Sequence, residues 1–273
     1  MTFAPVVPFG GYPGWAFLNR TLEAQKKAFT GDAALQRDEA YFREKIGSID
    51  TAEKLVGDRR LLSVALSAYG LDGDINNKYF LRKILEDGTL TAAALGNRLV
   101  DKRYLEFSKA FGFGDFPIPN TAKSDFADKI LKAYEARKFE IAVGAQNSDM
   151  RLALNAQREL EVIAKRNISP NTKWLAALGS PPLRTVLQTA FGLPGSFAGV
   201  DLDKQVAVLK DRAEKLLGSA DVGQFSDPEK TEKLVRLFLV RSPAQQSDFG
   251  TGSAALSLLQ TGGGATGRFS RYV

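Results

Sequence analysis

Residues 56–116 decide the fold, and they read VGDRRLLSVALSAYGLDGDINNKYFLRKILEDGTLTAAALGNRLVDKRYLEFSKAFGFGDF. Two segments of this stretch end on an aromatic residue, a glycine and a large apolar residue, Tyr-Gly-Leu at 69–71 and Phe-Gly-Phe at 111–113. A third copy, Phe-Gly-Leu, lies at 191–193. Glycine adopts the left-handed conformation at a helix end without steric cost, and the apolar residue after it packs back against the last turn. The sequence therefore predicts three helices that end at the glycines of these motifs.

The central part of the chain has the pattern of amphipathic helices. Asp58 and Asp74, for example, are of a type favoured at N-caps and should cap the helices that follow them, where apolar side chains recur three and four residues apart. Almost no segment alternates polar and apolar residues with a period of two, as a half-buried strand does. The predicted fold is all-α, a compact multihelical domain over residues 15–241. Its helices are expected at about 15–30, 33–45, 52–57, 59–69, 75–86, 92–100, 102–111, 123–144, 148–166, 174–178, 181–191, 201–217 and 227–240.

The two ends of the chain differ from this body. Residues 1–14 are rich in proline and glycine, so we expect an extended, flexible arm that is not helical. The large apolar side chains near this end either lie on the body or are presented to another protein. Residues 242–273 are rich in Gly, Ser and Thr, and we expect a flexible tail until this segment meets a partner.

The three similar helix ends raise the question of an internal repeat. The pattern L-x-x-V-x-x-x-A occurs at 61–68 and again at 183–190. The three glycines are unevenly spaced, however, whereas stacked repeats have a fixed period. Two explanations stay open, namely degenerate helical repeats or the independent use of one common helix ending.

The composition excludes several classes of site. The 273 residues include no histidine and no cysteine, which removes disulfides, thiolate nucleophiles, Cys/His metal sites and histidine-based catalytic triads. Lys and Arg number 37 against 31 Asp and Glu, a net charge of +6, and these charges are scattered along the chain. Scattered charge is typical of a solvated surface and does not favour nucleic-acid binding. We expect no catalytic residues, no cofactor and no metal.

Three weak motifs have simpler explanations. Residues 72–76, Asp-Gly-Asp-Ile-Asn, resemble the start of a calcium loop, but the sixth and twelfth positions lack the glycine and glutamate that such a loop needs. The glycines at 262–267 have the spacing of a phosphate-binding loop without its Lys-Ser/Thr pair. Glu44, Glu140 and Asp149 could serve a carboxylate-dependent hydrolase, but nothing in the sequence pairs them.

Candidate partner-binding residues come from local clusters. Basic residues follow an aspartate at 58–60 and at 101–103, one tryptophan begins the body, and a second tryptophan precedes a Pro-Pro turn. Exposed Trp and Arg side chains are frequent hot spots of protein interfaces. The alternatives are helix caps with surface ion pairs for the basic residues and a place in the core for the tryptophan near the Pro-Pro turn. The candidates are Trp15, Arg59, Arg60, Lys102, Arg103, Trp174, Pro181, Pro182 and Arg184.

A set of short motifs runs through most of the predicted body. They are Gly14-Trp15 with Gln25, Arg37-Asp38 with 41–43, 58–62 with 68–71, 97–99 with 101–104, Phe139-Glu140 with Met150-Arg151, and 181–184. As a set they resemble a bacterial family known as a domain of unknown function, whose members are typically encoded in flagellar gene clusters of alphaproteobacteria. The resemblance covers about residues 12–241. It implies an all-α fold and a link to the flagellum, and it supplies no catalytic residues.

These observations together predict a non-enzymatic, flagellum-associated structural or assembly protein that acts through contacts with other flagellar or export proteins. One alternative is a cytoplasmic export chaperone or adaptor, and another is a weakly basic nucleic-acid or regulatory binding module. The sequence has no apolar run long enough for a transmembrane helix and no signal-peptide pattern at its start. We therefore expect a cytoplasmic or flagellar location without Sec export.

Overall fold

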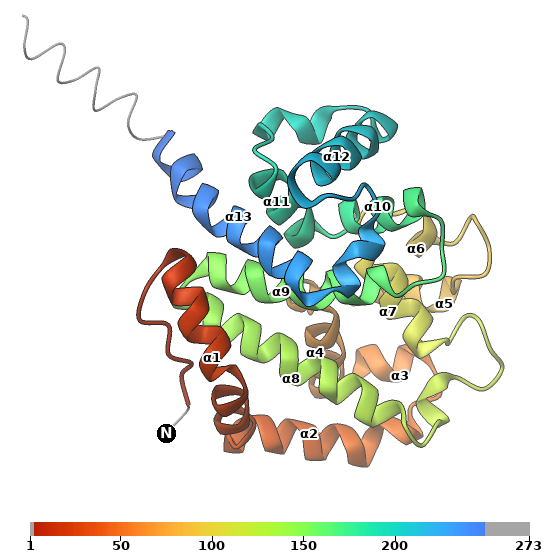
Figure 1. Ribbon diagram of the computed structural model, residues 1–273. Helices are drawn as coiled ribbons and strands as arrows, with labels where there is room; N and C mark the ends of the chain where they lie inside the picture. The colour runs from red at the N-terminus through yellow and green to blue at the C-terminus, as the bar shows by residue number, and fades with distance from the viewer. Residues whose placement is uncertain (1–2, 249–273) are drawn as a thin grey trace, which may run out of the picture.

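The fold is organised around α4 (Arg59–Tyr69), which lies near the centre of the molecule (Figure 1). Seven of its eleven residues are buried, so neighbouring elements must cover it on several sides. α8 (Phe126–Gly144) packs along its length, and α2 (Ala33–Lys45), α3 (Ala52–Gly57) and α7 (Arg103–Phe111) add to the cover. A helix buried this fully explains why the stretch around it carries so many apolar residues.

The computed structural model describes residues 3–248, with side-chain surroundings as far as Ser242, and this part of the chain contains helices and no strand. The prediction of an all-α multihelical body is confirmed. None of the helices in the described part has the length and hydropathy to cross a bilayer. The other helices are α1 (Gly11–Thr30), α5 (Lys78–Asp87), α6 (Leu95–Arg98), α9 (Ser148–Ala164), α10 (Pro170–Leu178), α11 (Pro181–Ala190), α12 (Leu202–Leu217) and α13 (Pro228–Asp248), and short 3₁₀ turns are η1 (Ile46–Ser48), η2 (Asp72–Asp74), η3 (Asn120–Ala122), η4 (Gly195–Gly199) and η5 (Val222–Ser226).

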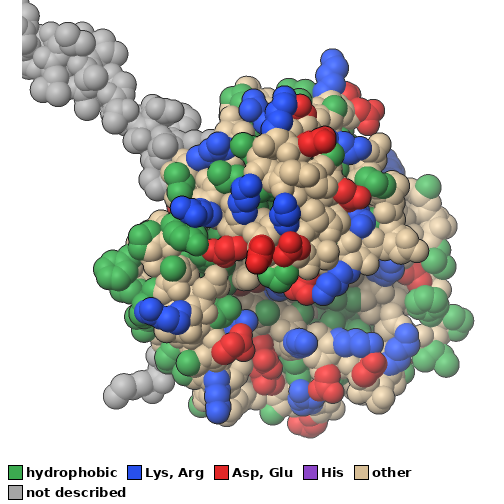
Figure 2. Space-filling model, viewed as in Figure 1, with side chains coloured by type: hydrophobic (Ala, Val, Ile, Leu, Met, Phe, Trp, Pro, Cys, Tyr) green, Lys and Arg blue, Asp and Glu red, His purple; other side chains and the backbone are tan. Residues whose placement is uncertain are grey.

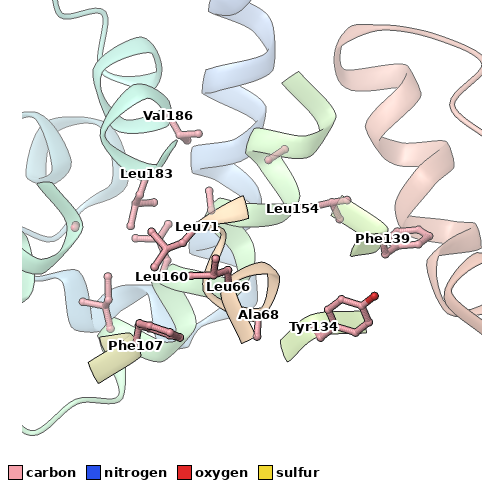
Figure 3. Packing of buried hydrophobic residues seen from close by; sticks show 14 of the residues in the cluster. Leu66, Ala68, Leu71, Phe107, Tyr134, Phe139, Leu154, Leu160, Leu183 and Val186 are labelled. Atoms are coloured by element: carbon pink, nitrogen blue, oxygen red, sulfur yellow. The ribbon is translucent and has the colours of Figure 1, made fainter. Parts of the chain in front are cut away.

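One continuous apolar core joins these helices. α9 packs against α8 on one side and against α11 and α13 on the other, so it connects the two halves of the molecule. Figure 3 shows Leu66 and Leu71 from the end of α4 beside Leu160 of α9, with Leu183 of α11 close by. The core therefore runs without a break from α4 to the C-terminal helices.

The three helix endings predicted from the sequence are confirmed. Gly70, Gly112 and Gly192 have φ values of 69°, 70° and 66°, all in the left-handed region. At the first ending, the N–H of Leu71 bonds the carbonyl of Leu66 at 2.9 Å, which is the six-to-one bond of a Schellman motif. The third ending makes the same bond, whereas the second makes the simpler five-to-one bond of the αL motif.

Each of these endings also receives a side-chain donor from elsewhere in the chain. Arg103 donates to the carbonyl of Gly70, and Asn120 donates to the carbonyl of Ala110 at 2.9 Å. Arg241 donates to the carbonyl of Ala190 at the end of α11. The last carbonyls of a helix have no partner within the helix, so these donors supply hydrogen bonds that would otherwise be missing.

The repeated pattern at 61–68 and 183–190 occupies equivalent places in two helices. All its Leu, Val and Ala positions are buried, in α4 and in α11. The two helices have different neighbours, however, because α4 packs mainly on α8 and α11 packs mainly on α13 and α9. The different neighbours favour the independent use of one common helix ending over degenerate helical repeats.

The N-terminal arm is shorter than the predicted 1–14. α1 begins at Gly11, so the expectation that this region cannot be helical is wrong for its last four residues. Pro13 lies in the first turn, where a backbone N–H has no intrahelical partner and its absence costs nothing. The same rule places Pro170, Pro181 and Pro228 at the starts of their helices.

The arm is fastened to the body from residue 3 onward, which differs from the expected flexible arm. The side-chain amide of Gln25 bonds both backbone groups of Val6, at 2.7 and 3.1 Å, and Gln146 bonds the backbone on either side of it. The chain at Phe9 passes so close to Gly14 that an added Cβ there would lie 1.9 Å from the carbonyl oxygen of Phe9. The arm thus lies on the body: Phe3, Val7 and Tyr12 pack against the core, whereas the side chains of Val6 and Phe9 are exposed.

Three helices in the middle of the chain have other bounds than predicted, among them α10, which begins at Pro170 and not at 174. Asp74 does not cap a helix at 75–86, because its carboxylate accepts from the hydroxyl of Tyr104 at 2.6 Å and from the side chain of Asn77 at 2.7 Å, and α5 begins later. The predicted helix 92–100 shrinks to the four residues of α6.

The C-terminal boundary also differs from the prediction. α13 continues through Pro243 to Asp248, beyond the end expected at 241. The alanine and glutamines after the proline have high helix propensity, which favours continuation once the proline's missing hydrogen bond is passed. The rest of the predicted tail, with the glycine motif at 262–267, lies outside the described residues.

Replacing Gly70 by alanine tests the helix ending. An added Cβ would have its nearest neighbour 3.5 Å away, so the change strains the left-handed backbone without causing a clash. We expect Gly70→Ala to lower the free energy of unfolding by roughly 1–2 kcal/mol, measured by urea denaturation. Gly57→Ala is the control, because a Cβ there meets nothing within 4 Å. Equal stability of Gly70→Ala and the wild type would contradict this explanation.

Candidate functional site

A pocket of about 320 Å³ opens at the C-terminal end of α4. Its walls come from α4, α7, α8 and α9 and from the turn between α10 and α11. Most of the lining is apolar and includes Ala68, Tyr69, Ala133, Val162 and Ala176. The charged side chains that line it are Lys102, Arg103, Arg137, Arg158, Arg166, Glu106 and Glu159.

Two arginines and two glutamates form a largely buried ion network in the wall of this pocket, with the side chain of Arg158 31% exposed. Arg137 donates to Glu159 at 2.8 Å and to Glu140 at 3.3 Å. Arg158 donates to Glu140 at 2.6 Å, and the hydroxyl of Ser180 donates to Glu159 at 2.6 Å. The side chain of Glu140 is only 7% exposed. The network holds these four charged groups in one arrangement, since a buried charge without its partner is costly.

Glu159 stays ionised inside the network. Burial acts to raise the pKa of Glu159, but the positive charges of Arg137 and Arg158 and the hydrogen bond from Ser180 outweigh it and hold the pKa below its usual value. A carboxyl whose pKa is lowered by folding adds stability above its unfolded pKa and loses that contribution as the pH falls. The network therefore stabilises the fold at neutral pH and weakens in acid.

Lys102 and Arg103 join the pocket to the helix ends around it. Arg103 donates to Gly70 at the end of α4 and forms an ion pair with Asp101 at 2.6 Å. The backbone N–H of Lys102 donates to the carbonyl of Gly179 at 3.2 Å. A Cβ added to Gly179 would lie 2.8 Å from the Cγ of Lys102, so the lysine stem passes directly over this glycine. Both predicted basic residues are thus held in place at the pocket.

The other predicted basic pair lies elsewhere. Arg59 and Arg60 begin α4, whose eleven residues separate them from the pocket end by about 16 Å. Arg60 pairs with Asp38 at 2.9 Å and lies over the ring of Tyr41, and Arg59 donates to Asn76 at 3.1 Å. The structure does not bring the two basic clusters together.

Both candidate tryptophans are fully buried, so Trp15 is corrected as a partner-binding residue and the core alternative is confirmed for Trp174. The indole N–H of Trp15 donates to Glu232 at 2.9 Å and ties α1 to α13. The indole N–H of Trp174 donates to the carbonyl of Ala220 at 2.9 Å. The physical reason is that an indole buries a large apolar area once its single N–H has a partner.

The remaining candidates belong to the first turn of α11. Pro181, Pro182 and Arg184 are half-buried, and none of them lines the pocket. Ser180, the residue just before them, does line it and donates to the buried network. The Pro-Pro turn therefore contributes to the pocket through its preceding serine.

The three candidate catalytic carboxylates lie in separate surroundings. Glu44 pairs with Lys45 at 2.9 Å, Glu140 belongs to the buried network, and Asp149 accepts from the hydroxyl of Ser242 at 2.7 Å. No contact joins any two of them within the described residues. Among those residues there is also no group of three or more acidic side chains that could hold a metal ion.

An apolar edge, formed by the loops 88–94 and 112–119, is the second surface feature. Thr89 fastens the two loops together, since its backbone N–H and its hydroxyl donate to the carboxylate of Asp115 at 2.5 and 2.8 Å. Figure 2 shows hydrophobic side chains along the right margin of the molecule, where Figure 1 places these loops. The residues of the apolar edge are Leu90, Phe116 and Ile118, whose exposed fractions are 74%, 50% and 73%.

The face shown in Figure 2 carries mixed charge. Lys and Arg side chains are interspersed with Asp and Glu side chains, with no large area of a single sign. Many of these charges are paired at the surface, and such pairs contribute little to stability.

The buried network was not foreseen as part of a pocket. Arg137 lies three residues after Tyr134 and four before Ile141, so the helix period puts its charge on the same side as apolar residues. Charge at a core-facing position of a predicted helix was the available signal. Which residues would meet it from α9 depends on tertiary packing and could not be obtained from the sequence.

Comparison with known families identifies the family of this chain. A family model described as "Protein of unknown function (DUF1217)" matches residues 68–231. The chain belongs to this family. The DUF1217 match contains every residue that lines the pocket, from Ala68 to Ser180.

A solved structure resembles the whole fold. The X-ray crystal structure of protein AGR_C_984 from Agrobacterium tumefaciens has a TM-score of 0.72 and 26% sequence identity, over 89% of this chain and 99% of that protein. No curated protein matches the chain. The DUF1217 assignment confirms the family-level resemblance seen in the sequence and carries no activity with it.

Glu39 of α2 is a half-buried titratable group, away from the pocket. Its Oε1 is buried and has no hydrogen-bond partner. Burial, and after it the negative charges of Glu135 on α8 and Asp38, raise the pKa of Glu39 to about 7, while Arg43 acts in the opposite direction. This carboxyl therefore changes its charge near neutral pH.

Replacing Glu140 by glutamine tests the buried network. The change leaves the guanidinium groups of Arg137 and Arg158 with one carboxylate instead of two. We expect the free energy of unfolding at pH 7 to fall by roughly 3 kcal/mol, measured by urea denaturation. Asp211→Asn is the control, because Asp211 pairs with Lys215 on the surface and should matter little. Similar effects of the two substitutions would show that the network is not what stabilises this region.

Replacing Glu39 by glutamine tests the raised pKa. A carboxyl whose pKa is higher in the folded than in the unfolded chain favours folding at low pH, and that contribution is lost as the pH rises to about 7. The stability of Glu39→Gln relative to wild type should therefore increase between about pH 5 and pH 8 and level off outside that range. Parallel stability curves for Glu39→Gln and the wild type would contradict the shift.

Proposed function

We propose that this DUF1217 protein is a non-enzymatic, flagellum-associated structural or assembly protein that acts through contacts with other flagellar or export proteins. The link to the flagellum rests on the motifs that resemble a family encoded in flagellar gene clusters. The mode of action rests on the apolar edge, which is the single observation that carries the proposal.

The apolar edge has the properties of a contact surface. Its three side chains are large and at least half exposed, although contact with water is unfavourable for large apolar groups. Phe116, Pro117 and Ile118 also line a shallow open hollow. A partner residue placed in this hollow would remove apolar surface of both proteins from water, which is the main favourable contribution to association.

Hydrogen bonds hold the two loops of the apolar edge in place. The bonds from Thr89 to Asp115 join the loops, and Asn120 holds the second loop to the end of α7. A Cβ added to Gly114 would lie 2.4 Å from the backbone nitrogen of Gly88, so the two loops approach each other closely. A surface fixed before binding loses less conformational freedom when a partner attaches.

The mixed charge of the visible face supports protein contacts over nucleic-acid binding. Binding to a phosphate backbone needs a continuous basic surface. The net charge of +6 is instead spread among acidic groups. Structural contacts between proteins have no such requirement.

Fractionation of cells that carry a tagged copy tests the proposal. The cytoplasm, purified hook–basal bodies and the culture medium are compared in the parent bacterium and in a strain without the flagellar export gate. We expect the protein in the hook–basal body or the medium, and we expect that fraction to disappear without the gate. A purely cytoplasmic protein, together with normal flagella after deletion of the gene, would refute the proposal.

A pair of variants tests the apolar edge itself. Leu90→Asp with Ile118→Asp should reduce association with the hook–basal body by at least about tenfold, because charges replace the groups that the partner covers. Val240→Asp is the matched control, since Val240 is 62% exposed on α13 and does not belong to the edge. Thermal unfolding of all proteins shows whether each variant is folded. Normal association of the folded double variant would contradict a role for the edge.

A further inference from the structure

The pocket at the end of α4 has the size and lining of a small-molecule site. Its volume of about 320 Å³ lies at the lower end of the range usual for ligand pockets. Such sites combine mostly apolar walls with a few fixed polar groups. The alanines at 68, 133 and 176 keep the side chains of three different helices short, which leaves this space open.

Nearly all the charges of the pocket cancel. Arg137 and Arg158 are balanced by two buried glutamates, Arg103 is balanced by Asp101, and Arg166 pairs with Glu106 at 3.2 Å. Lys102 is different. Its ammonium donates to the carbonyl of Asn97 at 2.8 Å, and no carboxylate among the described side chains forms an ion pair with it.

Some arginine donors at the pocket are also unused. A guanidinium has five N–H donors. In the described part of the chain, Nη1 of Arg158 and Nε and Nη2 of Arg166 donate to no protein atom. These groups can donate to an acceptor on a bound molecule without breaking the ion pairs.

We propose that this pocket binds a small organic carboxylate, with Lys102 as its counter-ion and the apolar walls around its hydrocarbon part. The single uncompensated positive charge matches one negative charge on the ligand. The glycine at 179 leaves room for the lysine stem over the α10–α11 turn, and the ammonium is held at the carbonyl of Asn97. This site is independent of the apolar edge and goes beyond the proposed function.

The probe for the test is octanoate, which has one carboxylate and an apolar chain. Titration of the isotope-labelled full chain, followed by NMR, should shift the amide signals of Gly179 and Ser180. Octan-1-ol has the same chain without the charge and should bind at least about threefold more weakly. Equal binding of octanoate and octan-1-ol would overturn the role of the charge, and no shift at these two amides up to about 10 mM octanoate would overturn the site.

A charge reversal at Lys102 separates this site from non-specific binding. Lys102→Glu should weaken octanoate binding by at least about tenfold. The variant should fold, because a negative charge at the start of a helix is favourable. Lys109→Glu is the matched control, since Lys109 is exposed on the same helix and does not line the pocket. Unchanged binding by folded Lys102→Glu would overturn the proposal.

Filling the pocket gives a second and independent test. Ala176→Phe should abolish the octanoate shifts, because the ring occupies the space of the hydrocarbon chain. The double variant of the apolar edge should bind octanoate like the wild type. Loss of octanoate binding in that edge variant, or its persistence in folded Ala176→Phe, would overturn the location of the site. Neither result depends on where the protein is found in the cell.

Discussion

Burial of α4 is the constraint on which the rest of the structure depends. The helix has seven buried residues; its start, at Arg59 and Arg60, is exposed, whereas its last turn is mostly covered, so the C=O groups there need partners from the protein. Asp58 accepts from two backbone N–H groups at the start of α4, and Arg103 donates to the carbonyl at its end. The charged groups around the pocket are therefore a consequence of where this helix stops. Arg103, which donates to the carbonyl of Gly70, carries a charge that needs a carboxylate partner in this covered position, and Asp101 provides it.

The same solution recurs at two other helix ends with different donors. Asn120 serves α7 and Arg241 serves α11, and both come from later in the chain than the helix that they complete. A left-handed glycine turns the chain away, so the exposed carbonyls face an element that arrives afterwards. Helix endings in this fold are thus tertiary contacts as well as local signals. This explains why short motifs at the endings were easy to see in the sequence while their partners were not.

The sequence predicted most helices because their signals are local. Asp58 and Gly70 gave the bounds of α4 as the structure has them. Asp74 misled because its carboxylate is used by Tyr104, from a different helix. At the pocket, Lys102 and Arg103 were foreseen as candidates from their motif, although for contact with a protein partner. The buried arginines and glutamates of α8 and α9 were missed as a site, because the sequence shows a charge but not the opposite charge that packing brings to it.

The bond between Trp15 and Glu232 joins side chains that lie 217 positions apart in the chain. α1 therefore cannot complete its packing until α13 has been synthesised. At bacterial synthesis rates of about 5–20 residues per second, the interval between these two residues is about 10–40 s. During this time the indole of Trp15 lacks its final partner while the ribosome is still at work. The nascent protein therefore has a long period in which other proteins in the cell can bind its N-terminal segment.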